Sequence, residues 1–217
     1  MGRSEHFVQF YESDEFIMNS VAEYVVHGLK SGEANIVLAS REKLAGIREG
    51  VEMLSVGLGD ASLKGKYIAL DAHKTLNRFT VDGMPDAELF SDVIGDVVTR
   101  ASKISRELCI FSEMIAILCG EKRFDAAVRL EELWNGFRKK HELSVFCACP
   151  IGAFKDRLDA ERMAQVCNAH CYVIPGESYT SITGTAERLR KIALLQQRAI
   201  ELETEFAAVA TGDAGIK

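Results

Sequence analysis

The sequence has no long apolar run and no cluster of basic residues. No stretch approaches the roughly 18 consecutive apolar residues that a membrane-spanning helix needs, and residues 1–12 lack the apolar segment of a secretion signal. Asp and Glu (32) outnumber Lys and Arg (26), for a net charge of −6. Such a surface is poorly suited to direct binding of nucleic acid or of an anionic membrane. We therefore expect a cytoplasmic protein whose six cysteines remain reduced.

The local motifs of common enzyme classes are also missing. No GxxxxGK[ST] phosphate loop is present, because Gly65-Lys66 is followed by Tyr67 and position 60 is Asp60. Residues 57–62 lack the last glycine of the dinucleotide fingerprint and follow a predicted helix where a strand is required. The sequence contains no HExxH, CxxC, GxSxG or protein-kinase signature. We therefore expect neither an enzyme nor a bound cofactor.

The sequence does contain a regular alternation of strand-like and helix-like segments. Its 217 residues, 47% of them hydrophobic, are enough for one large core and an appendage. Apolar runs predict strands at residues 6–11, 34–40, 66–71, 108–113, 143–150 and 171–175. Helical spacing predicts helices at residues 14–31, 42–55, 73–79, 86–102, 124–141 and 156–167. This alternation predicts an α/β fold with a mostly parallel sheet of about six strands and helices on both faces.

The C-terminal part differs in character from the rest. We expect an α/β domain over residues 5–176, a polar linker at 177–184, a helix at 185–208 and a frayed tail at 209–217. Apolar residues in this helix are spaced 3, 4, 3 and 4 apart, as in a coiled-coil seam; they are Ile192, Leu195, Ala199, Leu202 and Phe206. The pattern favours a homodimer, although two heptads also fit a single amphipathic helix packed on its own domain.

Polar residues gather where the predicted strands end. In an open α/β sheet ligands bind beyond the carboxyl ends of the parallel strands, so we predict a ligand-binding rim there, formed by Tyr11, Glu12, Ser40, Asp71, His73, Glu113 and Cys149. The rim has other interpretations. Asp71 is suited to cap the helix that follows it, and Glu113 is suited to a salt bridge with a neighbouring helix. As an enzyme, the chain would use Asp71, His73 and Glu113 as acid and base groups.

A cysteine-rich pattern near the end of the predicted domain admits two interpretations. Cys147 and Cys149 point to the same side of their strand because side chains alternate along it. With Cys167, His170 and Cys171 they could supply four tetrahedral zinc ligands. The spacing matches no standard zinc motif, and buried free cysteines are common in α/β cores, so we favour structural cysteines without a metal.

Several segments resemble one known family. They are residues 6–13 (HFVQFYES), 31–37 (SGEANIV), 70–72, 82–85 (DGMP), 111–114 (FSEM), 130–135 (LEELWN), 146–150 (FCACP) and 167–170 (CNAH). In this order they resemble the MEDS domain, the sensory domain of DcmR-type regulators of methylotrophs and methanogens, over residues 5–180. The resemblance implies a RecA/KaiC-like fold that has lost nucleotide hydrolysis. Residues 10–16, which would replace the phosphate loop of that fold, contain no glycine and no lysine.

The resemblance also implies a function. We expect a sensory input domain that binds a small organic ligand and relays its state through the C-terminal helix to a histidine kinase or a transcriptional output module. The chain would then be either a separate domain or a part of a longer protein. Two alternatives remain: a degenerate RecA-like interaction module without a ligand, and an enzyme that uses the three acid and base groups of the rim.

Overall fold

The structure is a computed structural model that describes residues 5–54, 65–141, 143–154, 159–174 and 176. These residues belong to one compact unit, which ends at Gly176. The predicted linker at 177–184, the predicted coiled-coil helix at 185–208 and the tail at 209–217 lie outside the described residues.

Strands and helices alternate along the unit much as predicted. The strands of the main sheet are β1 (His6–Tyr11), β2 (Ala34–Ala39), β3 (Tyr67–Asp71), β6 (Leu108–Ser112), β7 (Ser144–Pro150) and β8 (Tyr172–Ile174). The helices are α1 (Asp14–Ser31), α2 (Arg41–Leu54), α4 (Ala72–Arg78), α5 (Ala87–Ser102), α6 (Met114–Gly120), α7 (Phe124–His141) and α8 (Asp159–Ala169). A short hairpin, β4 (Thr80–Val81) and β5 (Met84–Pro85), precedes α5, and a 3-10 turn, Ile151–Ala153, follows β7.

The main sheet has six parallel strands in the order β3-β2-β6-β7-β1-β8. The first strand of the chain is therefore an inner strand between the last two, with Val8 opposite both Cys147 and Val173. Every carboxyl end of these strands faces the same edge of the sheet. This arrangement confirms the predicted α/β fold with helices on both faces.

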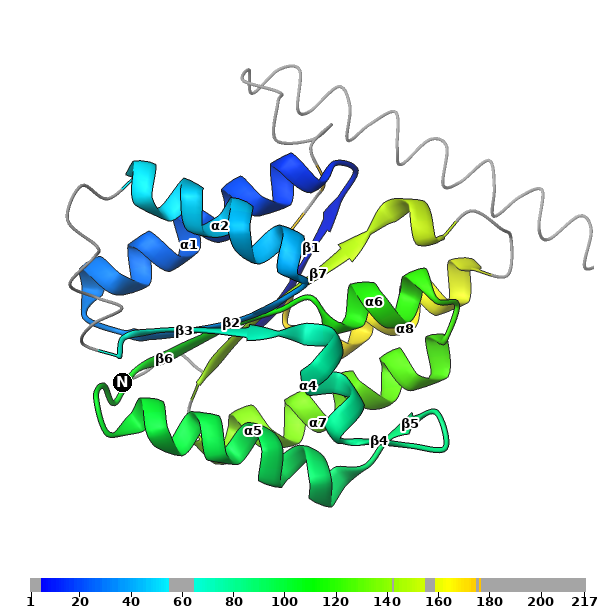
Figure 1. Cartoon of the computed structure of the whole chain (residues 1–217). Helices are drawn as coiled ribbons and strands as arrows, with labels where there is room; N and C mark the ends of the chain where they lie inside the picture. Colours follow the sequence, from blue (N-terminus) through cyan, green and yellow to red (C-terminus); the bar gives the residue numbers. More distant parts are fainter. Residues whose placement is uncertain (1–4, 55–64, 142, 155–158, 175, 177–217) are drawn as a thin grey trace, which may run out of the picture. The chain divides into compact units, whose positions relative to one another are not determined.

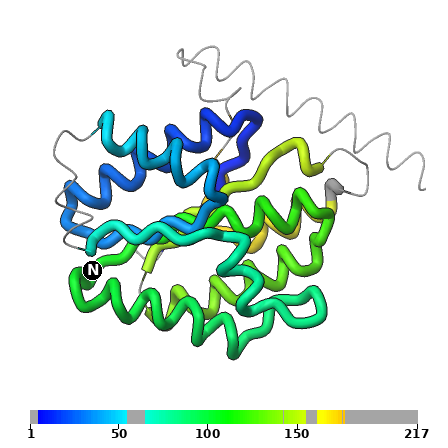
Figure 2. Tube along the Cα trace, in the orientation of Figure 1, coloured from blue at the N-terminus to red at the C-terminus, as the bar shows by residue number. Residues whose placement is uncertain are grey.

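The sheet is the middle of three layers. Helices α1 and α2, which follow β1 and β2, cover one face, whereas α4 to α8 cover the other (Figure 1). The trace shows the same division by sequence, because blue and cyan helices lie on one side of the sheet and green to yellow helices on the other (Figure 2). The larger core cluster surrounds Trp134 and Phe90, both at most 2% exposed. Among the described residues, no helix is long and apolar enough to cross a membrane.

Local signals account for the ends of most elements. Ser13 caps α1 by accepting a hydrogen bond from the Phe16 amide, and Gly32 ends the helix with a left-handed φ of 88°. The hairpin between β4 and β5 turns through Asp82 and Gly83, both with positive φ, as a two-residue turn requires. Helix α6 was not predicted, because MIAILCG is apolar at nearly every position and therefore has no helical periodicity.

Candidate functional site

Three residues of the predicted rim meet at the carboxyl edge of the sheet. Tyr11, Ser40 and Glu113 follow or end β1, β2 and β6, and Lys43 of α2 connects them. The Lys43 ammonium lies 2.6 Å from one Glu113 carboxylate oxygen and donates to the Tyr11 hydroxyl at 3.3 Å. The other Glu113 oxygen accepts the Ser40 amide proton at 2.6 Å. Glu113 therefore makes a salt bridge to a neighbouring helix, which is the alternative role considered for it in the sequence.

This network is compact and largely shielded from water. The side chains of Lys43 and Glu113 are 12% and 6% exposed, and Asp14 of α1 adds a second carboxylate 2.8 Å from Lys43. Burial would lower the pKa of Lys43, but hydrogen bonds to Asp14 and Glu113 outweigh it and raise the pKa above its usual range. Burial raises the pKa of Tyr11 to about 12. Lys43 therefore stays protonated and Tyr11 stays neutral at physiological pH.

Three further residues of the predicted rim, Asp71, Glu12 and His73, are not part of this network. Asp71 caps α4 by accepting the Lys74 amide proton at 3.0 Å, and its other oxygen accepts from Arg41 at 3.1 Å. These two contacts, the backbone one first, lower the pKa of Asp71. Glu12 and His73 have exposed side chains. The structure thus brings Tyr11, Ser40 and Glu113 into one network and leaves Glu12 and His73 at the surface.

Cys149 lies inside the protein, away from the rim. Its side chain is 0% exposed and belongs to the core on the α4 to α8 face of the sheet. A hydrogen bond with the Cys119 thiol, together with burial, raises the pKa of Cys149 well above the usual thiol range. The predicted place of Cys149 at the rim is wrong, because side-chain alternation along β7 turns this residue toward the core.

The connection between β1 and α1 differs from a phosphate-binding loop. Only Glu12 and Ser13 separate the strand from the helix, whereas a phosphate loop needs a longer glycine-rich turn with backbone amides free for phosphate oxygens. Ser13 already accepts one of these amides, and Asp14 and Glu15 place negative charge in the first helical turn. A phosphate at this position would meet carboxylates instead of donors.

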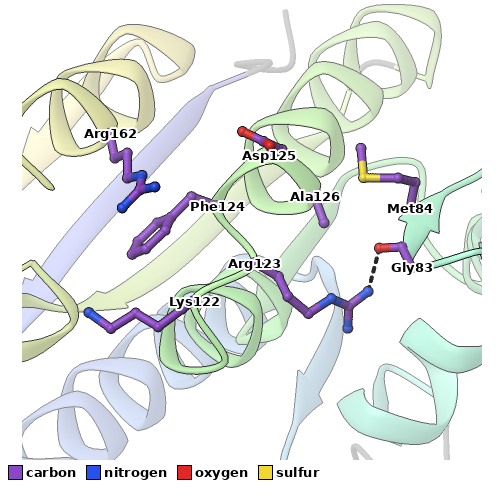
Figure 3. Close-up of a pocket in the computed structure, with 8 residues that line it drawn as sticks. All are labelled: Gly83, Met84, Lys122, Arg123, Phe124, Asp125, Ala126 and Arg162. Carbon is purple, nitrogen blue, oxygen red and sulfur yellow. Dashed lines mark hydrogen bonds between the residues drawn. The ribbon is translucent and has the colours of Figure 1, made fainter. Parts of the chain in front are cut away.

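A cavity of about 220 Å³ lies outside the predicted rim (Figure 3). It is formed by the β4–β5 turn, the start of α7 and one residue of α8, and its lining residues are Gly83, Met84, Lys122, Arg123, Phe124, Asp125, Ala126 and Arg162. The Arg162 guanidinium lies 4.5 Å and the Lys122 ammonium 5.5 Å from the centre of the Phe124 ring. Three cationic side chains and one carboxylate line the cavity, and Glu121 next to it pairs with Arg123 at 3.0 Å. The remaining net charge of +1 favours a small anion with an apolar part.

The backbone of this cavity is locally strained. Lys122 has a φ of 60°, in the left-handed region that non-glycine residues rarely occupy. Its ammonium donates to the Ala153 carbonyl at 2.8 Å, and Arg123 donates to the Gly83 carbonyl across the cavity mouth (Figure 3). Such conformations persist where surrounding contacts hold them, and they concentrate at ligand sites. The sequence did not predict this cavity, because its lining residues come from three segments that are far apart along the chain.

A second polar cluster lies wholly inside the unit, on the same face as Cys149. It joins His6 of β1, Glu131 of α7, Cys147 of β7 and His170, which follows α8. One donor atom from each of the four residues lies within 4.8 Å of the other three. The two imidazole Nε2 atoms lie 2.9 Å and 3.0 Å from the same Glu131 oxygen, and the side chains of both histidines and Glu131 are 0% exposed.

Charge compensation keeps the central carboxylate ionised. Burial would raise the pKa of Glu131, but His170 and His6 outweigh it and lower the pKa to about 2. Burial would lower the pKa of His170, and its interaction with Glu131 raises it instead. Burial raises the pKa of the Cys147 thiol well above its usual range. The cluster therefore has an ionised carboxylate between two fully buried imidazoles.

The residues of this cluster only partly match the cysteine-rich set considered as zinc ligands. Cys147 and His170 do meet, but His6 and Glu131 complete the group. Cys149 faces Cys119 instead, and Cys171 accepts a contact from Arg138 at 3.3 Å. All six cysteines are free thiols. The one signal in the sequence for Glu131 was its position between the apolar residues Leu130 and Trp134 of the predicted helix.

Comparisons with known proteins place the fold and the family. A KaiC-like protein from the hyperthermophilic archaeon Pyrococcus horikoshii has a similar structure, with a TM-score of 0.50 and 16% identity over 79% of this chain and 72% of that chain. At this identity the likeness concerns the fold alone. No curated protein matches the chain. The profile of one family, described as the methanogen/methylotroph DcmR sensory domain (MEDS), matches residues 5–171, and the chain therefore belongs to the MEDS family of sensory domains.

Proposed function

We propose that this MEDS domain senses a small organic anion, such as a short carboxylate, and relays its binding to an output module through the segment after residue 176. The cavity of about 220 Å³ between the β4–β5 turn, α7 and α8 is the single observation that carries this proposal. Its size suits a molecule of a few heavy atoms. Arg162 and Lys122, both beside the Phe124 ring, suit a carboxylate, and the ring suits the attached carbon chain.

The position of the cavity supports a relay toward the C-terminal part. Arg162 is on α8, the last helix of the described unit, and α8 leads directly to His170, β8 and Gly176. A ligand can shift an output only when it binds two conformations with different affinity. An anion that pairs with Arg162 would favour one position of α8 relative to α7, and that difference would continue into the next segment.

The carboxyl edge supports a role other than nucleotide binding. The Lys43 network lies at the carboxyl edge beside the start of α1, where Asp14 and Glu15 oppose the negative charge of a phosphate. The same contacts argue against the enzyme alternative, because Asp71 and Glu113 each have partners of their own at the helix cap and at Lys43. We therefore propose a non-catalytic sensor.

A thermal-shift experiment tests the ligand class. The probes are acetate, propionate, glycolate and benzoate, with acetamide as a neutral counterpart and ATP with magnesium as the nucleotide. A carboxylate at 100 times its Kd should add about 2.7 kcal/mol of stability, which raises Tm by roughly 5–10 °C for a chain of this size. Arg162→Met should abolish the increase, whereas Arg129→Met, an exposed arginine of α7 outside the cavity, should preserve it.

The outcomes are distinct. Stabilisation by acetamide equal to that by acetate would refute an anion site, and an unchanged response in Arg162→Met would place the site elsewhere. Stabilisation by ATP with magnesium but by no carboxylate would indicate that this domain binds a nucleotide and not an organic anion.

The relay is tested separately through the oligomeric state. We propose that the helix predicted at 185–208 forms a homodimeric coiled coil that links the sensor to a histidine kinase or transcriptional module. A version ending at residue 185 should then be monomeric by analytical ultracentrifugation, while the full chain is dimeric. Unchanged dimerisation after this truncation would contradict the proposed route.

A further inference from the structure

We propose that His6, Glu131, Cys147 and His170 form a four-coordinate site for a divalent transition-metal ion, with zinc as the fitting ion. This site is separate from the anion cavity and does not depend on the proposed sensory ligand. Two imidazole nitrogens, one carboxylate oxygen and one thiolate sulfur are all common zinc ligands in proteins. The set holds four donors and leaves no position for water, as in structural zinc sites.

The hydrogen bonds around the two imidazoles determine which nitrogen faces the cluster. The Nδ1 atom of His170 lies 2.7 Å from the Val166 carbonyl oxygen, which can only accept a proton. Nδ1 therefore carries the hydrogen, and Nε2 of the neutral ring presents a lone pair to the interior. Metal-binding histidines are commonly oriented in this way by a backbone carbonyl.

His6 is oriented by the same principle through a side-chain amide. The Asn135 nitrogen donates to the Ala169 carbonyl at 2.6 Å, so its oxygen must be the atom that faces His6. That oxygen lies 3.1 Å from His6 Nδ1 and also accepts from Arg138 Nε at 3.1 Å. His6 Nδ1 is therefore a donor as well, and its Nε2 lone pair faces Glu131.

Both Nε2 atoms then point at an acceptor. They lie 2.9 Å and 3.0 Å from one oxygen of Glu131, so each contact needs either a shared proton or a metal ion between its two atoms. The other Glu131 oxygen is buried without a hydrogen-bond partner, as is His170 Nε2. A buried carboxylate with an unpartnered oxygen is costly unless positive charge compensates it. A cation at the centre would pair with His170 Nε2 and compensate the charge of the buried carboxylate.

The donor separations lie on either side of those in a tetrahedral zinc site, and the charge of the ligand set matches zinc. Bonds of about 2.0–2.3 Å in a tetrahedral site place the donor atoms roughly 3.3–3.7 Å apart. The donor separations here are 2.9 Å, 3.0 Å, 3.4 Å from His6 Nε2 to Cys147 Sγ, and 3.9 Å from that sulfur to Glu131. Zn²⁺ with one carboxylate and one thiolate is electrically neutral. Binding would release the Cys147 thiol proton to solvent, and the buried site would have no net charge.

The location suggests what such a site would do. Its ligands come from β1, α7, β7 and the residue after α8, so one ion would join the inner strands to the end of the last helix. His170 lies two residues before the start of β8, whose Tyr172 and Val173 are exposed at the sheet edge. Zinc would therefore hold the C-terminal end of the described unit against its core.

The experiment uses the untagged full chain, because a histidine tag would bind metal itself. Zinc is measured by mass spectrometry after equilibration with excess zinc and exhaustive dialysis, for wild type, Cys147→Ala and Cys149→Ala. Both cysteines are fully buried on the same side of β7, and only Cys147 is a proposed ligand. We expect one zinc per chain in wild type and Cys149→Ala, and at least a tenfold lower content in Cys147→Ala.

A second measurement does not depend on the folding of any variant. Cobalt added to the metal-free wild-type protein should give the visible absorption of a tetrahedral ion and a thiolate-to-cobalt charge-transfer band. Circular dichroism verifies that each variant is folded, and Glu131→Gln replaces Cys147→Ala if that variant is not. Wild-type protein with neither bound zinc nor this spectrum would overturn the proposal and leave a proton-bridged His–Glu–His cluster.

Discussion

Removal of the Glu113 charge should destabilise the protein through Lys43. In Glu113→Gln the ammonium loses its most buried anionic partner and keeps only Asp14, whose side chain is 65% exposed. Leaving a buried charge without its partner costs about 3–5 kcal/mol when the pair is fully desolvated. Because Lys43 is 12% exposed and retains Asp14, we expect a loss of about 2–3 kcal/mol.

A double-mutant cycle with Lys43→Met isolates the interaction. The single change Lys43→Met leaves Glu113 with only the Ser40 amide, and we expect a similar loss of about 2–3 kcal/mol. The double variant should lose less than the sum of both, with a coupling energy of about 2 kcal/mol. Urea unfolding followed by fluorescence of Trp134 measures this, since it is the single tryptophan and is fully buried.

A surface pair provides the control for this cycle. Arg129 and Glu132 lie 2.9 Å apart on α7 with side chains 41% and 61% exposed. Exposed pairs of this kind contribute about 0–1 kcal/mol, so the matching cycle with Arg129→Met and Glu132→Gln should give a coupling below about 0.5 kcal/mol. A coupling this small for Glu113 and Lys43 would refute the reasoning that their network is desolvated.

Two further predictions concern other parts of the core. Burial and a hydrogen bond to Glu33 raise the pKa of Cys109 from 9.0 to about 12. The thiol therefore ionises at a lower pH in the unfolded state than in the folded state, so the free energy of unfolding falls as pH rises above 9. Between pH 8 and pH 10 the loss from Cys109 should be about 1.4 kcal/mol, and urea titrations should show a correspondingly smaller loss in Cys109→Ala. Gly50→Ala should destabilise, because the new Cβ would lie 2.9 Å from Ala22 Cβ, whereas Gly95→Ala, with open space around it, should stabilise by about 0.5–1 kcal/mol; equal effects on Tm would contradict the packing described between α1 and α2.

Much of the fold was predictable from local patterns. The fully buried β2 and the capped ends of α1 come from short-range properties, namely a continuous apolar run and a serine and glycine at helix ends. The same holds for the missing phosphate loop, since two residues between β1 and α1 leave no room for one. Helix α6 escaped prediction because an apolar segment without periodicity fits a strand and a buried helix equally.

The candidate sites were less predictable, and the reason is distance along the chain. A strand-end rule placed Tyr11, Ser40 and Glu113 at one edge, but nothing in the sequence distinguished Lys43 from the other basic residues as the group that joins them. The cavity around Phe124 forms where a hairpin turn, the start of α7 and a residue of α8 lie together. These contacts depend on how the helices pack on the sheet, which local sequence does not encode.

The sequence by itself determined the class of the protein: a parallel α/β domain of the MEDS family, without the loop that binds phosphate. The tertiary structure alone decided which polar groups share an interior. His6 and Cys147 are 141 positions apart, and they meet because β1 lies beside β7 in the sheet. Glu131 and His170 join them because α7 and the end of α8 pack on the same face. Parallel strand order and helix packing, and not spacing along the chain, thus create the proposed metal site.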